Sequence, residues 1–346
     1  MRTFVIAEAG VNHNGSLELA GQMIDAAIEA GADAIKFQTF TAENVVSPHA
    51  RKAAYQEVND GAGTQFDLLK QLELSEQDHL TLMAQCDERG IEFMSTPFDT
   101  NALDFLVSSG IRRLKIPSGE ITNHPFLEHI AAKGLPMIVS TGMATMVEVC
   151  EAIDVIASRL EQSGLAVKNM VTVLHCTSNY PTRFGDVNLR AMALMGKELD
   201  LAFGYSDHTN GIAVCPAAVA IGASVVEKHF TLDRTLAGPD HNASIEPAEL
   251  KAMIAQIRDV ELAMGSCEKG PTASEEDMRI DARRSITAAA DLQPGDKIEN
   301  RHLSILRPAT GIHPKHHADL VGKQIARPVA HGAALQWEDL VTETDA

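Results

Sequence analysis

One unit recurs between residues 31 and 229 and restricts the fold that the chain can adopt. In each copy a helix-like stretch ends at a glycine, a short apolar run follows, and the run stops at a polar cluster. Glycine just past a helix supplies the left-handed backbone that ends the helix. An apolar run of about five residues is typical of a strand buried on both faces. The clearest copies are Gly31–Gln38, Gly90–Thr96, Gly110–Ser118, Gly134–Ser140 and Gly222–His229.

Repetition of this unit predicts a (β/α)8 TIM barrel, an α/β fold whose active site lies at the carboxyl ends of its parallel strands. Ser16 is expected to cap the first helix, because its hydroxyl can accept a backbone hydrogen bond, and Pro247 to begin the last one. Eight strands are expected: Thr3–Ala7, Ala34–Phe37, Met170–Leu174, Leu201–Phe203 and Ser224–Val226, with three more that end at Pro97, Ser118 and Gly142.

The pattern changes after the barrel, which is expected to occupy residues 1–265. Residues 266–281 are polar and contain Gly270 and Pro271, a composition typical of a linker. Residues 282–346 break into short strand-like pieces separated by turns, which indicates a small, mostly β module. A module of this size buries little apolar surface, so we expect it to gain stability by docking on a barrel.

Charge and cysteine content indicate which partners and which cell compartment to expect for the protein. The formal net charge is −18 at pH 7, which argues against nucleic acid and anionic membranes as partners. The five cysteines are scattered without C-x-x-C spacing, as in a cytoplasmic protein that keeps its thiols reduced. No targeting segment and no membrane-spanning run is expected, so the predicted location is the cytoplasm.

Two histidines fall at the expected ends of consecutive strands. His208 follows the seventh strand and His229 the eighth. Neighbouring strands lie about 4.8 Å apart, so the two imidazoles can share one divalent ion. Two histidine ligands, with the other coordination positions left to water or substrate, suggest Mn²⁺ or a similar ion acting as a Lewis acid.

Cations and hydroxyls also gather at the strand ends. Lys36, Lys115, Ser118, Ser140 and Ser206 form a set that suits a phosphate or a carboxylate. A lysine on a barrel strand can instead form a Schiff base, which is the chief rival mechanism.

Carboxylates supply candidates for proton transfer. Glu8, Glu120 and Asp240 each follow a strand-like run or a glycine-containing turn, and each can serve as a general acid or base if it reaches the reacting atoms. Glu8 is the strongest of them, because it ends a central strand. Cys176 is a poor candidate for a nucleophile paired with His175, because adjacent residues of a strand face opposite sides.

Taken in order, these motifs resemble the sialic acid synthase family. The resemblance runs through Ala7–Gly15, Lys36–Gln38, Ser95–Phe98, Lys115–Glu120, Ser140–Met143, His175–Thr177, Gly204–Thr209 and Glu227–Thr231. The C-terminal motifs Ala282–Ile286 and Arg307–Ile312 resemble the antifreeze-like (SAF) domain of that family. The match covers essentially the whole chain.

The resemblance implies an enzyme that condenses phosphoenolpyruvate with an N-acylated mannosamine-type sugar. The products are a nonulosonic acid and phosphate, released by C–O cleavage. The main expectation is an N-acetylneuraminate synthase acting on N-acetylmannosamine. The alternative is a legionaminic acid synthase acting on 2,4-diacetamido-2,4,6-trideoxymannose. An enzyme with a different mechanism, a Schiff-base aldolase, is a further alternative. A non-enzymatic carbohydrate-binding protein is the last one.

The resemblance also assigns roles to residues. It implies a divalent metal, usually Mn²⁺ with Mg²⁺ or Co²⁺ as substitutes, on His208 and His229. It implies a domain-swapped homodimer in which Arg307 reaches the partner's site. Two positions depart from the family pattern: Ser178, where relatives often have Asn, and Ala309, where they often have Gly. The implied phosphoenolpyruvate contacts are Lys36, Thr96, Lys115, Ser118, Ser140, Ser178 and Ser206, and the implied sugar contacts are Gln38, Tyr180, Asp240 and Arg307.

Overall fold

The computed structural model describes residues 2–52 and 63–341 and divides into two compact units. The first unit is Met1–Gly265 and the second is Ser266–Ala346. Within the described residues, no helix is both long enough and apolar enough to cross a membrane.

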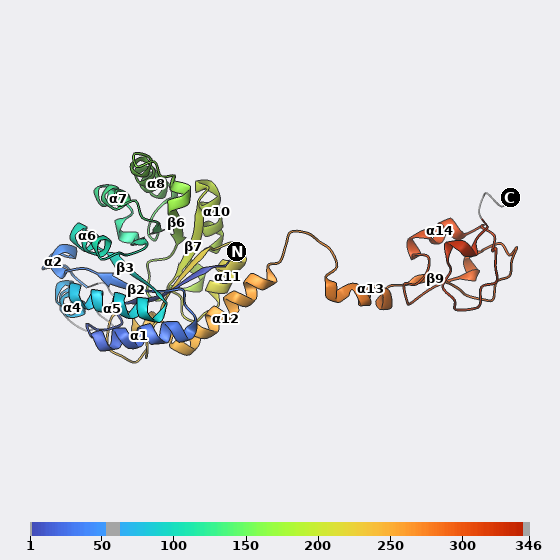
Figure 1. Ribbon diagram of the computed structural model, residues 1–346, viewed down its shortest axis with the longest axis horizontal. Helices are drawn as coiled ribbons and strands as arrows, with labels where there is room; N and C mark the ends of the chain where they lie inside the picture. Colours follow the sequence, from blue (N-terminus) through green and yellow to red (C-terminus); the bar gives the residue numbers. More distant parts are fainter. Residues whose placement is uncertain (1, 53–62, 342–346) are drawn as a thin grey trace. The chain divides into compact units, whose positions relative to one another are not determined.

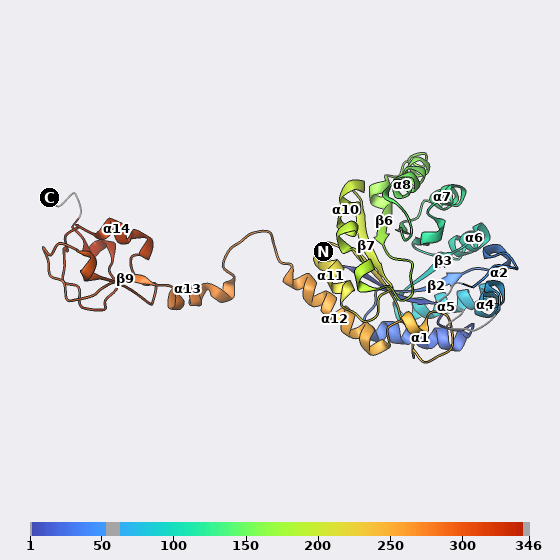
Figure 2. The same ribbon diagram turned by 180° about the vertical axis from the view of Figure 1, so that it is seen from behind.

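The first unit is the predicted barrel. Its parallel strands follow the order β3-β2-β1-β8-β7-β6-β5-β4, and β3 lies beside β4, so the sheet is nearly closed. Figure 1 shows the helices arranged around these strands, and Figure 2 shows the same ring from behind. The strands are β1 Phe4–Gly10, β2 Ala34–Thr39, β3 Glu92–Pro97, β4 Leu114–Ile116, β5 Met137–Ser140, β6 Val171–His175, β7 Ala202–Asp207 and β8 Val225–His229.

Helices connect the strands, and the first and the last begin where the sequence predicts. The Ser16 hydroxyl accepts a hydrogen bond from the backbone N–H of Leu19, Gly31 ends the same helix at φ 85°, and Pro247 begins α12. The helices of this unit are α1 Leu17–Ala30, α2 Ala42–Val45, α4 Gln65–Leu72, α5 Glu76–Arg89, α6 Thr100–Ser108, α7 His124–Ala131, α8 Met146–Glu161, α9 Val167–Met170, α10 Leu189–Leu199, α11 Val214–Ala220 and α12 Pro247–Ala263.

Two strands are longer than predicted. The seventh was expected to end at Phe203 and the eighth at Val226, but β7 continues to Asp207 and β8 to His229. The apolar runs mark only the part of each strand that packs in the core. Beyond them, the two strands stay paired in register through Ser206 opposite Glu227 and Asp207 opposite Lys228. Ser206, Glu227 and His229 are therefore held on strands rather than on loops.

The barrel interior is filled below the mouth. Ile6, Met94, Ile138, Leu174 and Val225 are buried together inside the sheet. A larger apolar layer lies between the sheet and the helices. A packed interior leaves the carboxyl ends of the strands as the place where a ligand can enter.

The second unit has a small core of its own. Its antiparallel pair is β9 Ser285–Ala288 and β10 Leu303–Leu306, and its helices are α13 Glu276–Ala282 and α14 His317–Leu320. Ile286, Leu320, Ile325 and Leu335 are fully buried in its core. The segment 266–281, expected to be a linker, includes the short turn Ala273–Glu275 and most of α13.

Candidate active site

A cavity of about 510 Å³ opens at the carboxyl ends of the barrel strands. All the predicted residues of the first unit except Glu120 line it. These are Glu8, Lys36, Gln38, Thr96, Lys115, Ser118, Ser140, Ser178, Tyr180, Ser206, His208, His229 and Asp240. The fold therefore brings together residues that are more than 230 positions apart in the chain.

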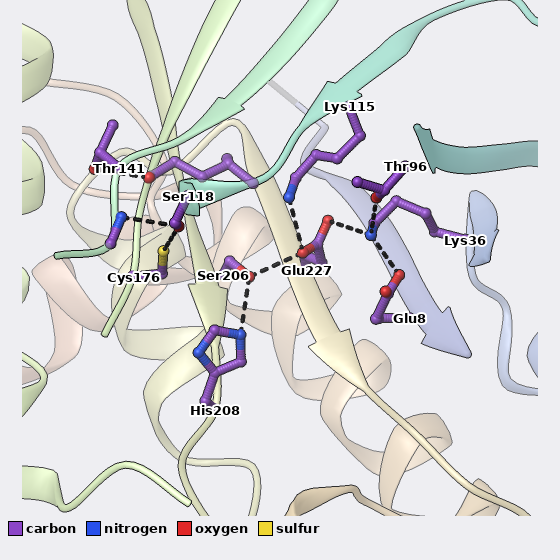
Figure 3. Close-up of polar contacts among 12 residues, drawn as sticks. Glu8, Lys36, Thr96, Lys115, Ser118, Thr141, Cys176, Ser206, His208 and Glu227 are labelled. Carbon is purple, nitrogen blue, oxygen red and sulfur yellow. Dashed lines mark hydrogen bonds and ion pairs between the residues drawn. The ribbon is translucent and has the colours of Figure 1, made fainter. Parts of the chain in front are cut away.

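Two lysines and two glutamates form the buried floor of this cavity. The ammonium group of Lys36 lies 2.7 Å from Glu8 Oε2 and 3.6 Å from Glu227 Oε2, and it donates to Thr96 Oγ1 at 2.9 Å. Lys115 Nζ lies 3.3 Å from Glu227 Oε1, which also accepts a hydrogen bond from Ser206 Oγ at 2.9 Å. Figure 3 shows Glu227 between the two lysines, with Glu8 on the far side of Lys36.

The two carboxylates of the floor differ in their pKa values. Burial raises the pKa of Glu8 to about 7, although Lys36 opposes the shift. Burial also raises the pKa of Glu227, but Lys115 and Lys36 outweigh it and bring the value to about 2. Glu8 can therefore exchange a proton near neutral pH, whereas Glu227 stays ionised and holds the two lysines.

Sequence reasoning missed Glu227. The residue stands inside the motif Glu227–Thr231, but no site role was predicted for it. Residues two apart in a strand share a face, so Glu227 and His229 point the same way, into the cavity. This spacing from a predicted metal ligand is the signal that could have identified it.

Hydroxyl groups line the side of the cavity formed by β4, β5 and β6. Ser118 Oγ accepts a hydrogen bond from the Gly142 N–H at 2.9 Å and lies 3.2 Å from Cys176 Sγ. A Cβ on Gly142 would lie 2.4 Å from Ser178 Oγ and 2.9 Å from Ser118 Oγ, so only glycine fits here without displacing them. The Ser140 hydroxyl is buried and has no hydrogen-bond partner among the described residues.

Cys176 is inactive as a thiolate, although it lines the cavity. Burial raises the pKa of its thiol, so the group stays protonated. His175 lies on the other face, where Nε2 contacts the carbonyl of Val187 at 2.9 Å. The prediction that the two neighbours face opposite sides is confirmed.

His208 and His229 face each other across the mouth. Their ring centroids are 5.3 Å apart, and the Tyr180 ring lies 4.2 Å from His208 and 5.6 Å from His229. Burial lowers the pKa of His208 to about 4 and that of His229 well below its usual value. Both rings are therefore neutral, with lone pairs available.

Each ring has a nitrogen that a ligand could approach, although His208 Nε2 lies 3.5 Å from Ser206 Oγ. His208 Nδ1 donates to the carbonyl of Thr177 at 2.7 Å, so the lone pair of this ring is on Nε2. His229 Nδ1 is buried, and no described residue forms a hydrogen bond with it. A buried imidazole nitrogen without a partner is what a bound divalent ion would satisfy.

An apolar wall forms part of the cavity lining. Leu68, Leu69 and Leu72 of α4 line it together with Val11 and Phe98. Leu68 and Leu72 are buried in a small apolar cluster with Val11, and Leu69 and Phe98 pack against that cluster while staying partly exposed. α4 lies in the segment between β2 and β3, of which residues 53–62 lie outside the described part.

Two predicted residues do not line this cavity. Glu120 ends the short turn Ser118–Glu120, and its carboxylate accepts a hydrogen bond from Asn123 Nδ2 at 2.6 Å. The turn points Ser118 into the cavity but not Glu120, so the predicted acid–base role of Glu120 has no support here. Arg307 belongs to the second unit, where its side chain is exposed, and its role stays a prediction.

The fold and the cavity define an enzyme of the barrel class whose site is lined by lysines, carboxylates and hydroxyl groups. The chain belongs to the NeuB family, whose model matches residues 23–269, and residues 283–341 match the SAF domain. The resemblance drawn from the sequence motifs is confirmed.

Relatives and solved structures agree with this assignment. The chain is 50% identical to the N,N'-diacetyllegionaminic acid synthase of Legionella pneumophila, over 98% of this chain and 95% of that one. It is 44% identical to the protein of the same name from Campylobacter jejuni, over 93% and 95% of the two chains. The N-acetylneuraminic acid synthetase of Leptospira borgpetersenii, solved with citrate, has a TM-score of 0.69 and 36% identity, covering 80% of this chain and 90% of that one. The protein is therefore an enzyme, a sugar acid synthase.

Proposed function

We propose that the protein condenses phosphoenolpyruvate with 2,4-diacetamido-2,4,6-trideoxymannose to give N,N'-diacetyllegionaminic acid and phosphate. The sequence alone put N-acetylneuraminate first, but the named relatives at 50% and 44% identity support the legionaminic alternative better. The observation that carries the proposal is one cavity with buried lysines, two neutral histidines and an apolar wall.

The apolar wall supports the choice of sugar. N-acetylmannosamine carries hydroxyls at C4 and C6, where the trideoxy sugar has an acetamido group and a methyl group. Leu69 and Phe98 present no polar atom to such groups. Burying the unpartnered C6 hydroxyl costs about 1–3 kcal/mol, whereas the C6 methyl group of the trideoxy sugar, and the methyl end of its C4 acetamido group, gain from the same contact. We place the distal end of the sugar against this wall and its aldehyde end near His208 and His229.

The floor and the hydroxyl groups suit phosphoenolpyruvate. Lys36 and Lys115 supply the positive charge for its phosphate and carboxylate. The unpartnered Ser140 hydroxyl supplies a donor that an anionic oxygen would satisfy, and Ser118, Ser178 and Ser206 add further hydroxyls on the same side. Thr96 steadies Lys36 through its hydrogen bond.

His208 and His229 fit a divalent metal, for which Mn²⁺ is our first choice. Among the described residues, no group of three or more His, Cys, Asp or Glu is placed to hold an ion. The protein would thus provide two imidazole ligands and leave the other coordination positions of the metal to substrate and water. A bound ion supplies Lewis-acid polarisation of the sugar aldehyde oxygen.

The reaction needs one new C–C bond, one water and one broken C–O bond. C3 of phosphoenolpyruvate attacks the aldehyde carbon, and the aldehyde oxygen becomes a hydroxyl by taking up the proton that water loses when it adds to C2. Water adds to the positive C2, and Glu8 is suited to accept its proton because the pKa of its carboxyl is about 7. The tetrahedral intermediate then loses phosphate together with the bridging oxygen, and the C2 hydroxyl gives its proton to the departing phosphate, which leaves the C2 ketone. Lys36 and Lys115 stabilise the negative charge of the departing phosphate.

A direct comparison of the two sugars tests the proposal. Phosphate release is followed with phosphoenolpyruvate, Mn²⁺ and either N-acetylmannosamine or the diacetamido sugar. We expect kcat/KM to favour the diacetamido sugar by at least about tenfold, the discrimination that one or two apolar groups provide. A preference for N-acetylmannosamine would return the assignment to N-acetylneuraminate. Borohydride with pyruvate should trap no adduct, since a trapped adduct would support the Schiff-base aldolase.

We also propose the quaternary arrangement that the family resemblance implies. The protein would be a domain-swapped homodimer in the cytoplasm, with Arg307 of each SAF domain contacting the sugar in its partner's barrel. The cysteines in the described structure are all free thiols, which supports a reducing compartment.

A further inference from the structure

A buried ion pair lies directly behind the two histidines. Asp207 and Lys228 are opposite each other in the register of β7 and β8. Both side chains are 0% exposed, and Lys228 Nζ lies 2.8 Å from Asp207 Oδ2. Because side chains alternate along a strand, these two point toward the helix layer while Ser206, Glu227 and His229 point into the cavity. The pair takes no part in the proposed reaction.

Both members of the pair hold the backbone of the same residue, Thr209. Asp207 Oδ1 accepts a hydrogen bond from the Thr209 N–H at 2.9 Å, and Lys228 Nζ donates to the Thr209 carbonyl at 2.5 Å. The Cys215 thiol of α11 donates to Asp207 Oδ2 at 3.3 Å. Thr209 directly follows His208, so the pair fixes the chain on the carboxyl side of that histidine.

Other contacts fix His208 from its remaining sides. Its carbonyl accepts a hydrogen bond from the Thr182 N–H at 2.8 Å, and its ring is held by the Thr177 carbonyl. Together with the pair, these contacts set the backbone and the ring orientation of His208. His229 is adjacent to Lys228 in β8, so the same ion pair links the strands that carry both rings.

We infer that Asp207 and Lys228 are positioning residues that set the spacing of His208 and His229 for a divalent ion. A fully buried ion pair generally adds little net stability, because desolvation of the two charges offsets their attraction. Its hydrogen bonds to a single residue beside a proposed ligand point instead to a geometric role. The inference rests on the proposal that His208 and His229 bind a metal.

The test measures Mn²⁺ binding without substrates, by titration followed with electron paramagnetic resonance. The main variant combines Asp207→Asn with Lys228→Met, which removes both charges and leaves none unpaired. Loss of a residue that orients metal ligands typically weakens metal affinity by about 10- to 100-fold. We expect the lower part of this range, because the pair acts through the backbone. Asp207→Asn alone is the second variant; it keeps an acceptor for the Thr209 N–H but leaves the buried Lys228 ammonium without its carboxylate, so it should lose stability as well as Mn²⁺ affinity.

The matched control is Asp33→Asn. Asp33 Oδ2 lies 3.0 Å from Arg258 Nη2 and accepts a hydrogen bond from the Val5 N–H at 2.8 Å, at the opposite end of the barrel. This variant should bind Mn²⁺ as the wild type does, even if it melts earlier. If the double variant and Asp207→Asn lose stability but keep wild-type Mn²⁺ affinity, the pair is structural and the inference is overturned. If the wild type itself binds no Mn²⁺, the metal proposal fails and the inference fails with it.

Discussion

Lys115 offers the sharpest test of the anion site. Its side chain is 5% exposed, and Nζ lies 3.3 Å from Glu227 Oε1. Lys115→Met keeps much of the length of the side chain and removes the charge. Glu227 then remains paired with Lys36 at 3.6 Å and with the Ser206 hydroxyl, so the variant should fold.

The expected effect follows from the loss of one charge-assisted contact to phosphoenolpyruvate. Such a contact contributes about 1.5–3 kcal/mol, which corresponds to a KM for phosphoenolpyruvate raised by about 10- to 150-fold. The KM for the sugar should change much less, because Lys115 is placed at the anion end of the cavity. Steady-state phosphate release, with each substrate varied at saturation of the other, measures both values.

Lys168→Met is the control for loss of a lysine elsewhere in the barrel. Lys168 pairs with Asp200 at 2.6 Å, and both side chains are largely exposed, so its removal should leave both KM values near those of the wild type. If Lys115→Met raises only the KM for the sugar, the anion site has been placed at the wrong end of the cavity.

Three further predictions concern the rest of the site. Gly142→Ala places a Cβ 2.4 Å from Ser178 Oγ, so the KM for phosphoenolpyruvate should rise by about tenfold as a donor hydroxyl is displaced; an unchanged KM would separate these hydroxyls from the substrate. Burial raises the pKa of Asp240 to about 6 from 3.8, so its ionised form destabilises the fold increasingly as pH rises through that interval. Asp240→Asn should then add up to about 3 kcal/mol to the free energy of unfolding near pH 8 and little below pH 4. Urea denaturation measures this free energy, and a variant no more stable than the wild type at pH 8 would contradict the prediction. Mixing Arg307→Ala with His208→Ala subunits should restore activity, since each swapped heterodimer would hold one intact site, whereas exchanged mixtures that stay inactive would place Arg307 in its own chain's site or in none.

Much of the barrel could be predicted from local signals. Glycine after a helix, as at Gly31, and short apolar runs depend on neighbouring residues alone. The ends of β7 and β8 were predicted too early, because polar residues at the mouth of a barrel continue the strand without continuing its apolar pattern. Asp207 illustrates this, since it is fully buried and yet ionic.

The site was predictable to the extent that strand ends converge in a barrel. His208 and His229 could be paired in this way. The spacing of Glu227 from His229 could have placed it in the cavity, but its pairing with two lysines depends on which side chains surround it. The role of Leu69 could not be predicted, because it depends on where α4 lies against the barrel. Glu120 was chosen for its place in a motif, and the turn after β4 keeps it out of the cavity lining. Such features depend on tertiary packing, which one sequence does not display.

The most direct test of the central claim follows the bridging oxygen of phosphoenolpyruvate. The substrate is labelled with ¹⁸O between C2 and phosphorus and incubated with the protein, Mn²⁺ and 2,4-diacetamido-2,4,6-trideoxymannose. Mass spectrometry of the released phosphate and of the sugar acid then locates the label. The account predicts that the label leaves with the phosphate, because the C–O bond breaks and water supplies the new ketone oxygen. Unlabelled phosphate, with the ¹⁸O retained in the sugar acid, would show P–O cleavage and contradict the account.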